Sequence, residues 1–330
     1  MSRFFQLGTF SVAGCAPFAG IVVDEQVVAV SALARIGYSV SGADSVLGLL
    51  QAWEANNVVL ETAVADPAFS SLPATPLDSV QIHAPILYPR QIFCAGANYR
   101  QHVIDLIVDQ NRSPETQQMS AEERRAWGAQ MMDKRAAHGQ PYIFTKIPST
   151  ISGPFDAVVI PHDAEQPDWE LELVVVIGKT ARRVSREKAL EYVAGYTIAN
   201  DVTNREKVHR QDMKAIGSDW LAGKCSPSYL PMGPFLTPAQ FVEDPQKLHL
   251  TLKLNGDTMQ DQTADDMIFD IARLLEYASQ LAVLWPGDVL LTGSPKGNGT
   301  HYGRFLQPGD VMEGTITGLG TMRTPCVAEE

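Results

Sequence analysis

The sequence predicts a strand-rich α+β fold, with a small N-terminal domain of α/β character over residues 1–80 and a larger domain over residues 85–330. Three observations support this prediction. The 330 residues exceed what one compact core usually needs. Apolar residues alternate as in short strands in some segments and recur with helical spacing in others. A cluster of prolines between residues 73 and 89 interrupts regular structure, so we place the domain boundary there.

The N-terminal domain is predicted to begin with a hairpin. Residues 18–23 and 27–30 form short apolar runs on either side of a turn at residues 24–25. Two amphipathic helices are expected next, near residues 45–54 and 58–65, because apolar side chains recur at i, i+3 and i+4.

Two local signals organise the later part of the chain. Asn255-Gly256 lies between two short strand-like runs and predicts a type I′ hairpin. Thr263 with Asp266 resembles a capping box and predicts a helix of about eighteen residues that stops before Trp285.

Composition excludes several classes of function. The net charge is −12, so the chain lacks the basic footprint of a nucleic-acid-binding protein and would be repelled by anionic membranes. No apolar window is long enough to span a bilayer, and the N-terminus does not resemble a secretory signal. The four cysteines lack CxxC spacing, which argues against zinc or disulfides and predicts a cytoplasmic location. They are Cys15, Cys94, Cys225 and Cys326.

The most informative segment is the predicted strand over residues 167–178. Because strand side chains alternate between faces, Asp168, Glu170 and Glu172 point the same way. One interpretation is an edge strand with a solvated acidic face. The continuous apolar run over residues 173–177 instead indicates a strand buried on both faces, where carboxylates need nearby positive charge. Two glutamates at i and i+2 can converge on a hard cation such as Mg²⁺, Mn²⁺ or Ca²⁺.

A second acidic position follows downstream. Residues 196–201 are expected to form a strand that ends in Asn200 and Asp201. Asp201 at a strand end is well placed to supply a third oxygen ligand. A simple Asx turn explains the same residues equally well.

Motifs in a fixed order along the chain resemble the core of the fumarylacetoacetate hydrolase family. The resemblance runs from about Arg90 to Cys326. The matching segments are Glu170-Leu171-Glu172, residues 193–197, Asn200-Asp201-Val202 with Arg205, Gly223-Lys224, residues 232–235, residues 285–288, residues 291–295, residues 308–310 and residues 318–320.

The resemblance implies a mixed β-sandwich or β-roll, a homodimer, and a Mg²⁺ or Mn²⁺ centre. The two glutamates and one aspartate that hold the ion in this family fall on Glu170, Glu172 and Asp201. Members of the family cleave the carbon–carbon bond of 1,3-diketo acids. Others decarboxylate, dehydrate or isomerise related 2-oxo acids.

Residues 96–102 resemble the family motif Gly-x-Asn-Tyr-x-x-His, which precedes a mobile lid. In hydrolytic members the histidine activates water together with a glutamate three residues later. The corresponding residues here are His102 and Asp105, and an i, i+3 pair on a helix can make contact. We therefore expect His102 to be a general base oriented by Asp105, and Tyr99 to contact the substrate. A purely structural histidine at a loop–helix junction is the alternative.

Two lysines match recurring family positions. Lys224 is expected near the metal, where its charge would stabilise an enolate that develops in the transition state. Lys146 is suited to binding the substrate carboxylate. For Lys224 the alternative is an ordinary surface cation.

Arg205 and Ser294 complete the predicted site. Arg205 is suited to bidentate binding of a substrate carboxylate, or it pairs with Asp201 or Glu206. The turn over residues 292–297 offers backbone N–H groups and the Ser294 hydroxyl to an anion, unless it is a plain connecting turn.

The chain departs from the family pattern in three places. Many members follow the glycine–lysine pair with Ser-Phe-Asp, whereas Cys225 follows here. Asp219 stands where many have glutamine. The stretch over residues 105–140 is also longer than usual. We interpret it as an enlarged lid whose helix, over residues 120–138, begins with a Ser120–Glu123 capping box and has only a narrow apolar stripe.

The leading hypothesis is a Mg²⁺-dependent hydrolase that cleaves the C–C bond of a 2,4-dioxo acid or another β-diketone. In it, His102 and Asp105 activate water, and the partner is a small 2-oxo or dioxo acid. The alternative keeps the metal centre but acts as a decarboxylase, a dehydratase or hydratase, or a keto–enol isomerase. A non-catalytic metal-binding or scaffold protein is the candidate from another class.

Overall fold

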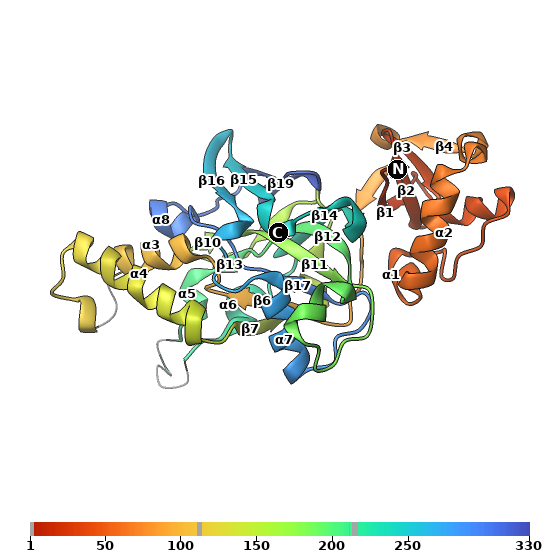
Figure 1. Cartoon of the computed structure of the whole chain (residues 1–330). Helices are drawn as coiled ribbons and strands as arrows, with labels where there is room; N and C mark the ends of the chain where they lie inside the picture. The colour runs from red at the N-terminus through yellow and green to blue at the C-terminus, as the bar shows by residue number, and fades with distance from the viewer. Residues whose placement is uncertain (1–2, 111–113, 211, 213–216) are drawn as a thin grey trace.

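The structure is a computed structural model that describes residues 3–110, 114–210, 212 and 217–330. Two large sheets, a separate two-stranded sheet and the helices around them form a β-rich α+β fold in the described residues, which confirms the expected class (Figure 1). The larger sheet has the strand order β4-β3-β2-β1-β14-β12-β11-β17-β6-β7, in which β4 spans Ala74–Pro76. Strands β5 (Gln81–His83) and β8 (Ile151–Ser152) are attached at its side. The smaller sheet has the order β16-β15-β18-β19-β9. No helix of the described residues has the length and apolarity needed to cross a membrane.

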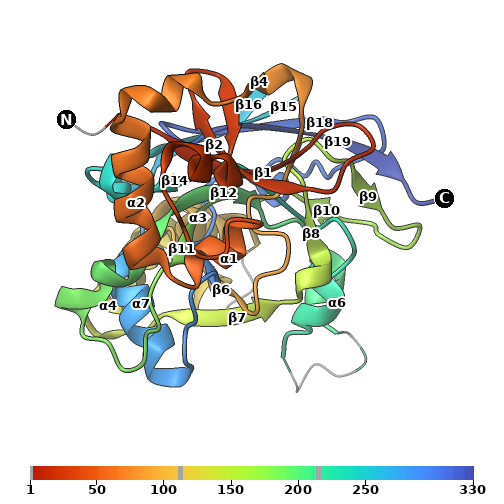
Figure 2. The same ribbon diagram turned by 90° about the vertical axis from the view of Figure 1, so that its right-hand side faces the viewer.

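The predicted N-terminal hairpin is confirmed. Strands β2 (Phe18–Val23) and β3 (Gln26–Ala29) pair antiparallel, with Val22 opposite Val27. Asp24 and Glu25 both have positive φ, at 49° and 60°, as the two central residues of a type I′ turn require. Helices α1 (Val46–Leu50) and α2 (Trp53–Ala65) lie beside these strands (Figures 1 and 2), and α2 begins earlier than its spacing predicts.

The N-terminal strands continue the sheet that carries the centre of the molecule. Strand β1 (Gln6–Ser11) pairs with β14 (Leu230–Pro238) through Leu7 and Leu236. One apolar core is shared by both regions, because Trp53 of α2 packs in the same cluster as Val174 and Val176. The two regions thus share a sheet and a core, and their division into domains at residues 1–80 and 85–330 remains a prediction.

Strands β11 (Leu171–Ile177) and β12 (Val193–Asn200) form the middle of the larger sheet. Every residue of both strands is buried, which confirms the prediction from the apolar run. Strands β17 (Val289–Leu291), β6 (Ile92–Gly96) and β7 (Tyr142–Lys146) extend the sheet on the other side of β11.

The smaller sheet packs against the larger one through apolar side chains. Leu250 and Leu252 of β15 (His249–Leu254) lie in the same core as Leu171 of β11. The hairpin predicted at Asn255-Gly256 is confirmed, because it joins β15 to β16 (Asp257–Thr263). The remaining strands of this sheet are β18 (Val311–Ile316), β19 (Gly320–Ala328) and β9 (Val158–Ile160).

The helix predicted to begin at Thr263 begins eight residues later, so that prediction was wrong. Helix α7 spans Ile271–Leu281, and the side chain of Asp270 caps it by accepting from the N–H of Arg273. The Asp266 carboxylate accepts from the N–H of Gln101, 2.9 Å away, and the Thr263 hydroxyl donates to Asp265, so both side chains have other partners than the predicted capping box. A tertiary contact thus overrides the local capping signal.

The predicted lid consists of two helices at one end of the molecule (Figure 1). These are α3 (Arg100–Gln110) and α4 (Ala121–His138), which pack on each other. The capping box of Ser120 and Glu123 is confirmed, since each side chain accepts from the other residue's N–H. Residues 111–113 of the predicted insertion lie outside the described residues. Motion of the predicted lid remains a prediction.

Candidate active site

Three carboxylates come together where β11 begins and β12 ends. Leu171 lies opposite Asn200 in the antiparallel pair, so Glu170 and Asp201 lie next to one another. The N–H of Asp201 donates to the backbone carbonyl of Glu170, at 2.8 Å, and holds the two ends in register. One oxygen from each of Glu170, Glu172 and Asp201 falls within 4.8 Å of the others. All three residues are buried.

This cluster suits a divalent cation. Its donors are all carboxylate oxygens, which are the ligands that hard ions such as Mg²⁺ and Mn²⁺ prefer. Burial and the neighbouring charges of Asp201 and Glu170 raise the pKa of Glu172 well above its ordinary value. The cluster therefore concentrates more negative charge than its surroundings favour, and a bound cation would relieve this repulsion.

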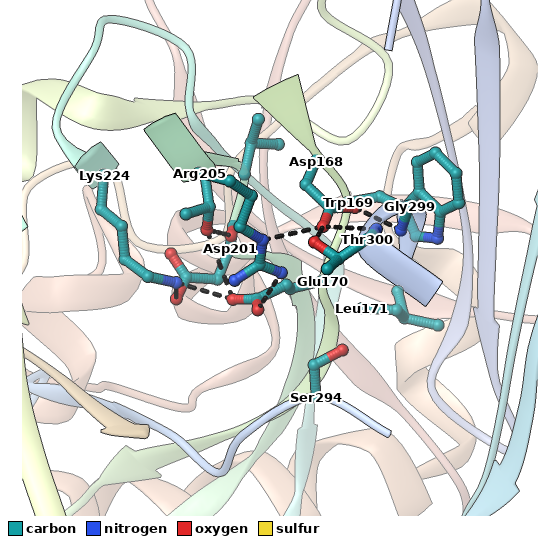
Figure 3. Close-up of polar contacts among 12 residues, drawn as sticks. Asp168, Trp169, Glu170, Leu171, Asp201, Arg205, Lys224, Ser294, Gly299 and Thr300 are labelled. Atoms are coloured by element: carbon teal, nitrogen blue, oxygen red, sulfur yellow. Dashed lines mark hydrogen bonds and ion pairs between the residues drawn. The ribbon is translucent and has the colours of Figure 1, made fainter. Parts of the chain in front are cut away.

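Lys224 and Lys146 are both buried beside the carboxylates. The Lys224 ammonium donates to Glu170 Oε2 at 2.6 Å and also to Asp201 Oδ2 (Figure 3). Lys146 donates to Asp201 Oδ1 at 2.7 Å, and to the carbonyls of Val202 and Tyr229. These contacts occupy all three N–H donors of Lys146 and indicate that it orients Asp201. Its predicted role at the substrate carboxylate remains a prediction.

Arg205 joins two acidic residues of the carboxylate segment. Its Nε donates to Asp168 Oδ2 at 2.8 Å, and its Nη2 donates to Glu170 Oε1 at 2.6 Å (Figure 3). Neither Asp201 nor Glu206, the partners considered from the sequence, receives these bonds. Burial opposes ionisation of Glu170, but Arg205 and Lys224 outweigh it and lower the pKa of that carboxyl.

Asp168 is a buried partner of Arg205, a role that the sequence indicated only by placing it on the carboxylate face of the strand. It is fully buried in β10 (Pro167–Asp168), which pairs with β13 (Thr203–Asn204). Besides Arg205, its carboxylate accepts from the N–H of Gly299 and from Thr300. Asp168 therefore fixes Arg205 against the site, although the shared strand face was the only sign of its importance.

His102 is buried on the lid helix α3. Burial lowers the pKa of its imidazole to about 4, and the charge of Glu170 acts on it more strongly than that of Asp105. The imidazole is therefore neutral at pH 7, as a general base must be.

Asp105 makes other contacts in this structure. Its Oδ1 accepts from Gln101 Nε2 at 2.8 Å and from Arg125 Nη1 of α4 at 2.9 Å. Within the described part of the chain, these are the partners of the Asp105 carboxylate, and His102 is not among them. The dyad of His102 and Asp105 remains a prediction.

The turn over residues 292–297 is tied directly to the carboxylate strand. The N–H of Gly293 donates to Glu172 Oε2 at 2.7 Å, and the Thr292 hydroxyl donates to the carbonyl of Leu173. Ser294 is buried beside the cluster (Figure 3). The side chain of Tyr99 is also fully buried; burial, and then the charge of Glu172, raise the pKa of its hydroxyl. The substrate roles of Ser294 and Tyr99 remain predictions.

Gln260 is a site neighbour that sequence reasoning missed. It is fully buried on β16, where its Nε2 donates to Ser294 Oγ at 2.9 Å and its Oε1 accepts from the N–H of Leu171 at 3.0 Å. It thereby links the turn to the start of β11. No motif or spacing distinguishes Gln260 in the sequence, because both partners lie far away along the chain.

Comparison with known proteins agrees with this architecture. The family model described as fumarylacetoacetate (FAA) hydrolase C-terminal matches residues 91–327. The chain belongs to the fumarylacetoacetate hydrolase family. That span contains every residue of the candidate site, from Tyr99 to Ser294.

Relatives within this family differ in their chemistry. The chain is 34% identical over 251 residues to the mitochondrial oxaloacetate tautomerase fahd2 of Xenopus laevis, covering 76% of this chain and 69% of the relative. It is 42% identical over 187 residues to 2,4-didehydro-3-deoxy-L-rhamnonate hydrolase of Sphingomonas sp. (strain SKA58), covering 56% and 64%. Both a tautomerase and a hydrolase are therefore similar to this chain.

A solved structure shares the fold along almost the whole chain. It is maleylpyruvate hydrolase from Sphingobium sp. SYK-6 in complex with manganese (II) ion and pyruvate, with a TM-score of 0.71 and 25% identity. The match covers 98% of this chain and 100% of that one. The N-terminal strands are thus part of the shared architecture.

Proposed function

We propose that this protein is a divalent-metal-dependent hydrolase that cleaves the C–C bond of a 2,4-dioxo acid or another β-diketone. The convergence of Glu170, Glu172 and Asp201 within 4.8 Å, in a buried site beside Lys224, carries the proposal. Mg²⁺ or Mn²⁺ held by these three carboxylates would polarise the chelating oxygens of the substrate as a Lewis acid. The manganese and pyruvate in the related maleylpyruvate hydrolase support both the ion and the 2-oxo acid class.

The protein's own groups then have separate tasks. His102, neutral because its pKa is low, accepts a proton from water, whose oxygen adds to the distal carbonyl carbon. The adjacent C–C bond breaks, its electron pair forms the departing enolate, and the proton held by His102 then passes to the enolate carbon to give the 2-oxo acid. The fixed ammonium of Lys224 stabilises the negative charge that grows on the departing enolate. We expect Asp105 to turn from Arg125 towards His102 when the lid closes.

Keto–enol isomerisation is the second candidate. The similarity to an oxaloacetate tautomerase supports it, and so does the pairing of Asp105 with Arg125, which leaves the water-activating dyad unformed. Isomerisation needs enolate stabilisation and proton transfer but no attacking water. Decarboxylation and dehydration of a 2-oxo acid also need enolate stabilisation and no attacking water, but they release CO₂ or water.

Product analysis decides between these reactions. Acylpyruvates and oxaloacetate are incubated with the protein and Mg²⁺ or Mn²⁺, and the products are followed by NMR. The hydrolase proposal predicts pyruvate plus a carboxylic acid, formed only with the metal. Interconversion of keto and enol forms without C–C cleavage, or release of CO₂, would replace it with the second candidate. Binding of metal without turnover of any substrate would favour a non-catalytic protein.

Assembly and location are further parts of the proposal. We expect a homodimer in the cytoplasm with no nucleic-acid or membrane partner, as the composition and the family resemblance predict. The tautomerase relative is named as a mitochondrial protein, so the location needs direct measurement. Light scattering and fractionation of cells test these two expectations.

A further inference from the structure

Strand β7 and helix α6 (Trp220–Lys224) face each other beside the carboxylate cluster. Tyr142, Phe144 and Lys146 share one face of β7, because strand side chains alternate. Trp220 and Lys224 are four residues apart, so they share one face of the short helix. Two adjacent elements thus carry both lysines of the site together with three aromatic rings.

The aromatic rings form a packed group, which we call the aromatic cluster: Tyr142, Phe144 and Trp220. The rings of Phe144 and Trp220 are stacked, with centroids 4.5 Å apart and an interplanar angle of 13°. Trp220 Nε1 also donates to the hydroxyl of Tyr142 at 2.6 Å. The hydrogen bond ties Trp220 to Tyr142, and the stacking places the Phe144 ring flat against the Trp220 ring.

The ammonium of Lys224 lies over that ring. Its Nζ is 5.1 Å from the centroid of Phe144, and the Lys224 and Phe144 side chains are both buried. A cation over an aromatic face is attracted by the ring quadrupole, and the attraction is larger where water is excluded. Lys224 therefore contacts carboxylates and a π face at the same time.

We propose that Phe144 is a positioning residue for Lys224, and that Trp220 supports it by stacking on the ring. This inference rests on the proposed role of Lys224 at the substrate. Lysine has a flexible four-carbon stem, so its charge needs fixed partners to stay in one place. A divalent ion would compete for the oxygens of Glu170 and Asp201 that hold the ammonium. The contact with Phe144 does not depend on those oxygens, and it keeps the charge where the enolate forms.

A double-mutant cycle separates this role from ordinary packing. Phe144→Leu keeps an apolar side chain but removes the π face, whereas Phe144→Tyr retains it. Each is made in the wild-type protein, and Phe144→Leu is also made in a Lys224→Met background. The readouts are the affinity of the protein for Mn²⁺, by EPR, and the affinity of the Mn²⁺-loaded protein for oxalate, by calorimetry. Oxalate mimics the planar enolate of a 2-oxo acid.

We expect Phe144→Leu to weaken oxalate binding roughly 5- to 30-fold, the range of a buried cation–π contact, and to leave Mn²⁺ affinity unchanged. Phe144→Tyr should bind oxalate like the wild type. In the Lys224→Met background, Phe144→Leu should have no further effect. Phe144→Met serves the same purpose as Phe144→Leu if the leucine variant does not fold.

Two results would overturn the inference. One is an equal loss of oxalate affinity in the presence and absence of the Lys224 ammonium, which would mean that Phe144 only packs. The other is unchanged oxalate affinity in Phe144→Leu. Failure of the wild-type protein to bind Mn²⁺ would instead contradict the proposed metal centre, so the two failures are distinguishable.

Discussion

The three carboxylates of the site differ in how their charges are compensated. Glu170 pairs with Arg205 and Lys224, and Asp201 pairs with Lys146 and Lys224. Glu172 accepts one backbone N–H, and its pKa is raised by burial and by the other two carboxylates. A buried charge without a counter-charge is costly, so Glu172 is the carboxylate of this cluster that would depend most on a bound cation.

The first prediction contrasts two isosteric substitutions. Glu172→Gln removes a ligand and should weaken Mn²⁺ binding by roughly 10- to 100-fold or more. It should not lower the melting temperature in EDTA, because burial and the neighbouring carboxylates already disfavour the charged form of Glu172, and glutamine resembles the neutral form. Glu170→Gln should weaken Mn²⁺ binding and also lower that temperature, since it leaves Arg205 and Lys224 short of a partner. Equal destabilisation by both variants would contradict this account of Glu172.

The second prediction concerns His102. His102→Ala should keep Mn²⁺ and oxalate binding but reduce turnover at least about 10²-fold, the usual contribution of a general base. Turnover on an acylpyruvate at saturating metal and substrate measures the loss. Unchanged turnover would remove His102 from the mechanism.

The third prediction is the pH dependence of that base. Burial lowers the pKa of His102 to about 4, so the imidazole stays unprotonated as the pH falls through the ordinary histidine range near 6.5. The ratio kcat/KM at saturating metal should therefore show no loss with a midpoint near pH 6.5. A decline there that disappears in His102→Ala would show that the base titrates normally.

At the scale of elements, the site depends on where strands and helices end. Strand β11 carries Glu172, the end of β12 places Asp201 beside Glu170, and α6 brings Lys224 across from β7. The lid helices α3 and α4 also carry two ion pairs with each other: Arg125–Asp105 and Arg100–Asp133. In each pair the arginine side chain is at least 39% exposed, so each pair contributes little to stability.

The fourth prediction tests how the lid controls Asp105. Arg125→Gln removes the charged partner of Asp105, keeps the neutral Gln101 amide on the same oxygen, and should let the carboxylate reach His102. We expect hydrolytic turnover to rise roughly 2- to 5-fold, which corresponds to about 0.5–1 kcal/mol for a partly exposed ion pair. Arg100→Gln is the matched control: it breaks the other pair of the lid and leaves Asp105 untouched. A similar change of turnover in both variants would indicate a general effect on the lid.

At the scale of the whole molecule, the N-terminal strands and the catalytic sheet share one core. Trp53 of α2 is nearly buried and packs against the end of β11, where a Cβ added at Gly178 would lie 2.6 Å from Trp53 Cδ1. The two predicted domains are thus coupled by packing as well as by the pairing of β1 with β14. Such coupling favours cooperative unfolding.

The fifth prediction follows from this shared core. Trp53→Ala should lower the free energy of unfolding by about 3–5 kcal/mol, as expected for deletion of a buried tryptophan side chain. Calorimetry should show one transition that shifts as a whole, with Mn²⁺ affinity retained at low temperature. Two transitions, of which only one shifts, would support independent domains.

The sequence by itself determined the features that depend on neighbours in the chain. Strand alternation put Glu170 and Glu172 on one face, Asn255-Gly256 set a hairpin, and the Ser120 capping box began a helix. Each follows from geometry within a few residues. For Asp201 the local pattern allowed two interpretations, a metal ligand at a strand end or a simple Asx turn. Only the family resemblance favoured the ligand.

The tertiary structure decided which charges meet. It brought Arg205 to Asp168 and Glu170. It gave all three N–H donors of Lys146 an acceptor. It paired Asp105 with Arg125, and Gln260 with Ser294. It also gave Asp266 a distant partner, the N–H of Gln101, in place of the predicted cap. These partners lie from 20 to 165 positions apart in the chain. Their contacts depend on how the two large sheets and the lid pack together, and local sequence periodicity does not predict that packing.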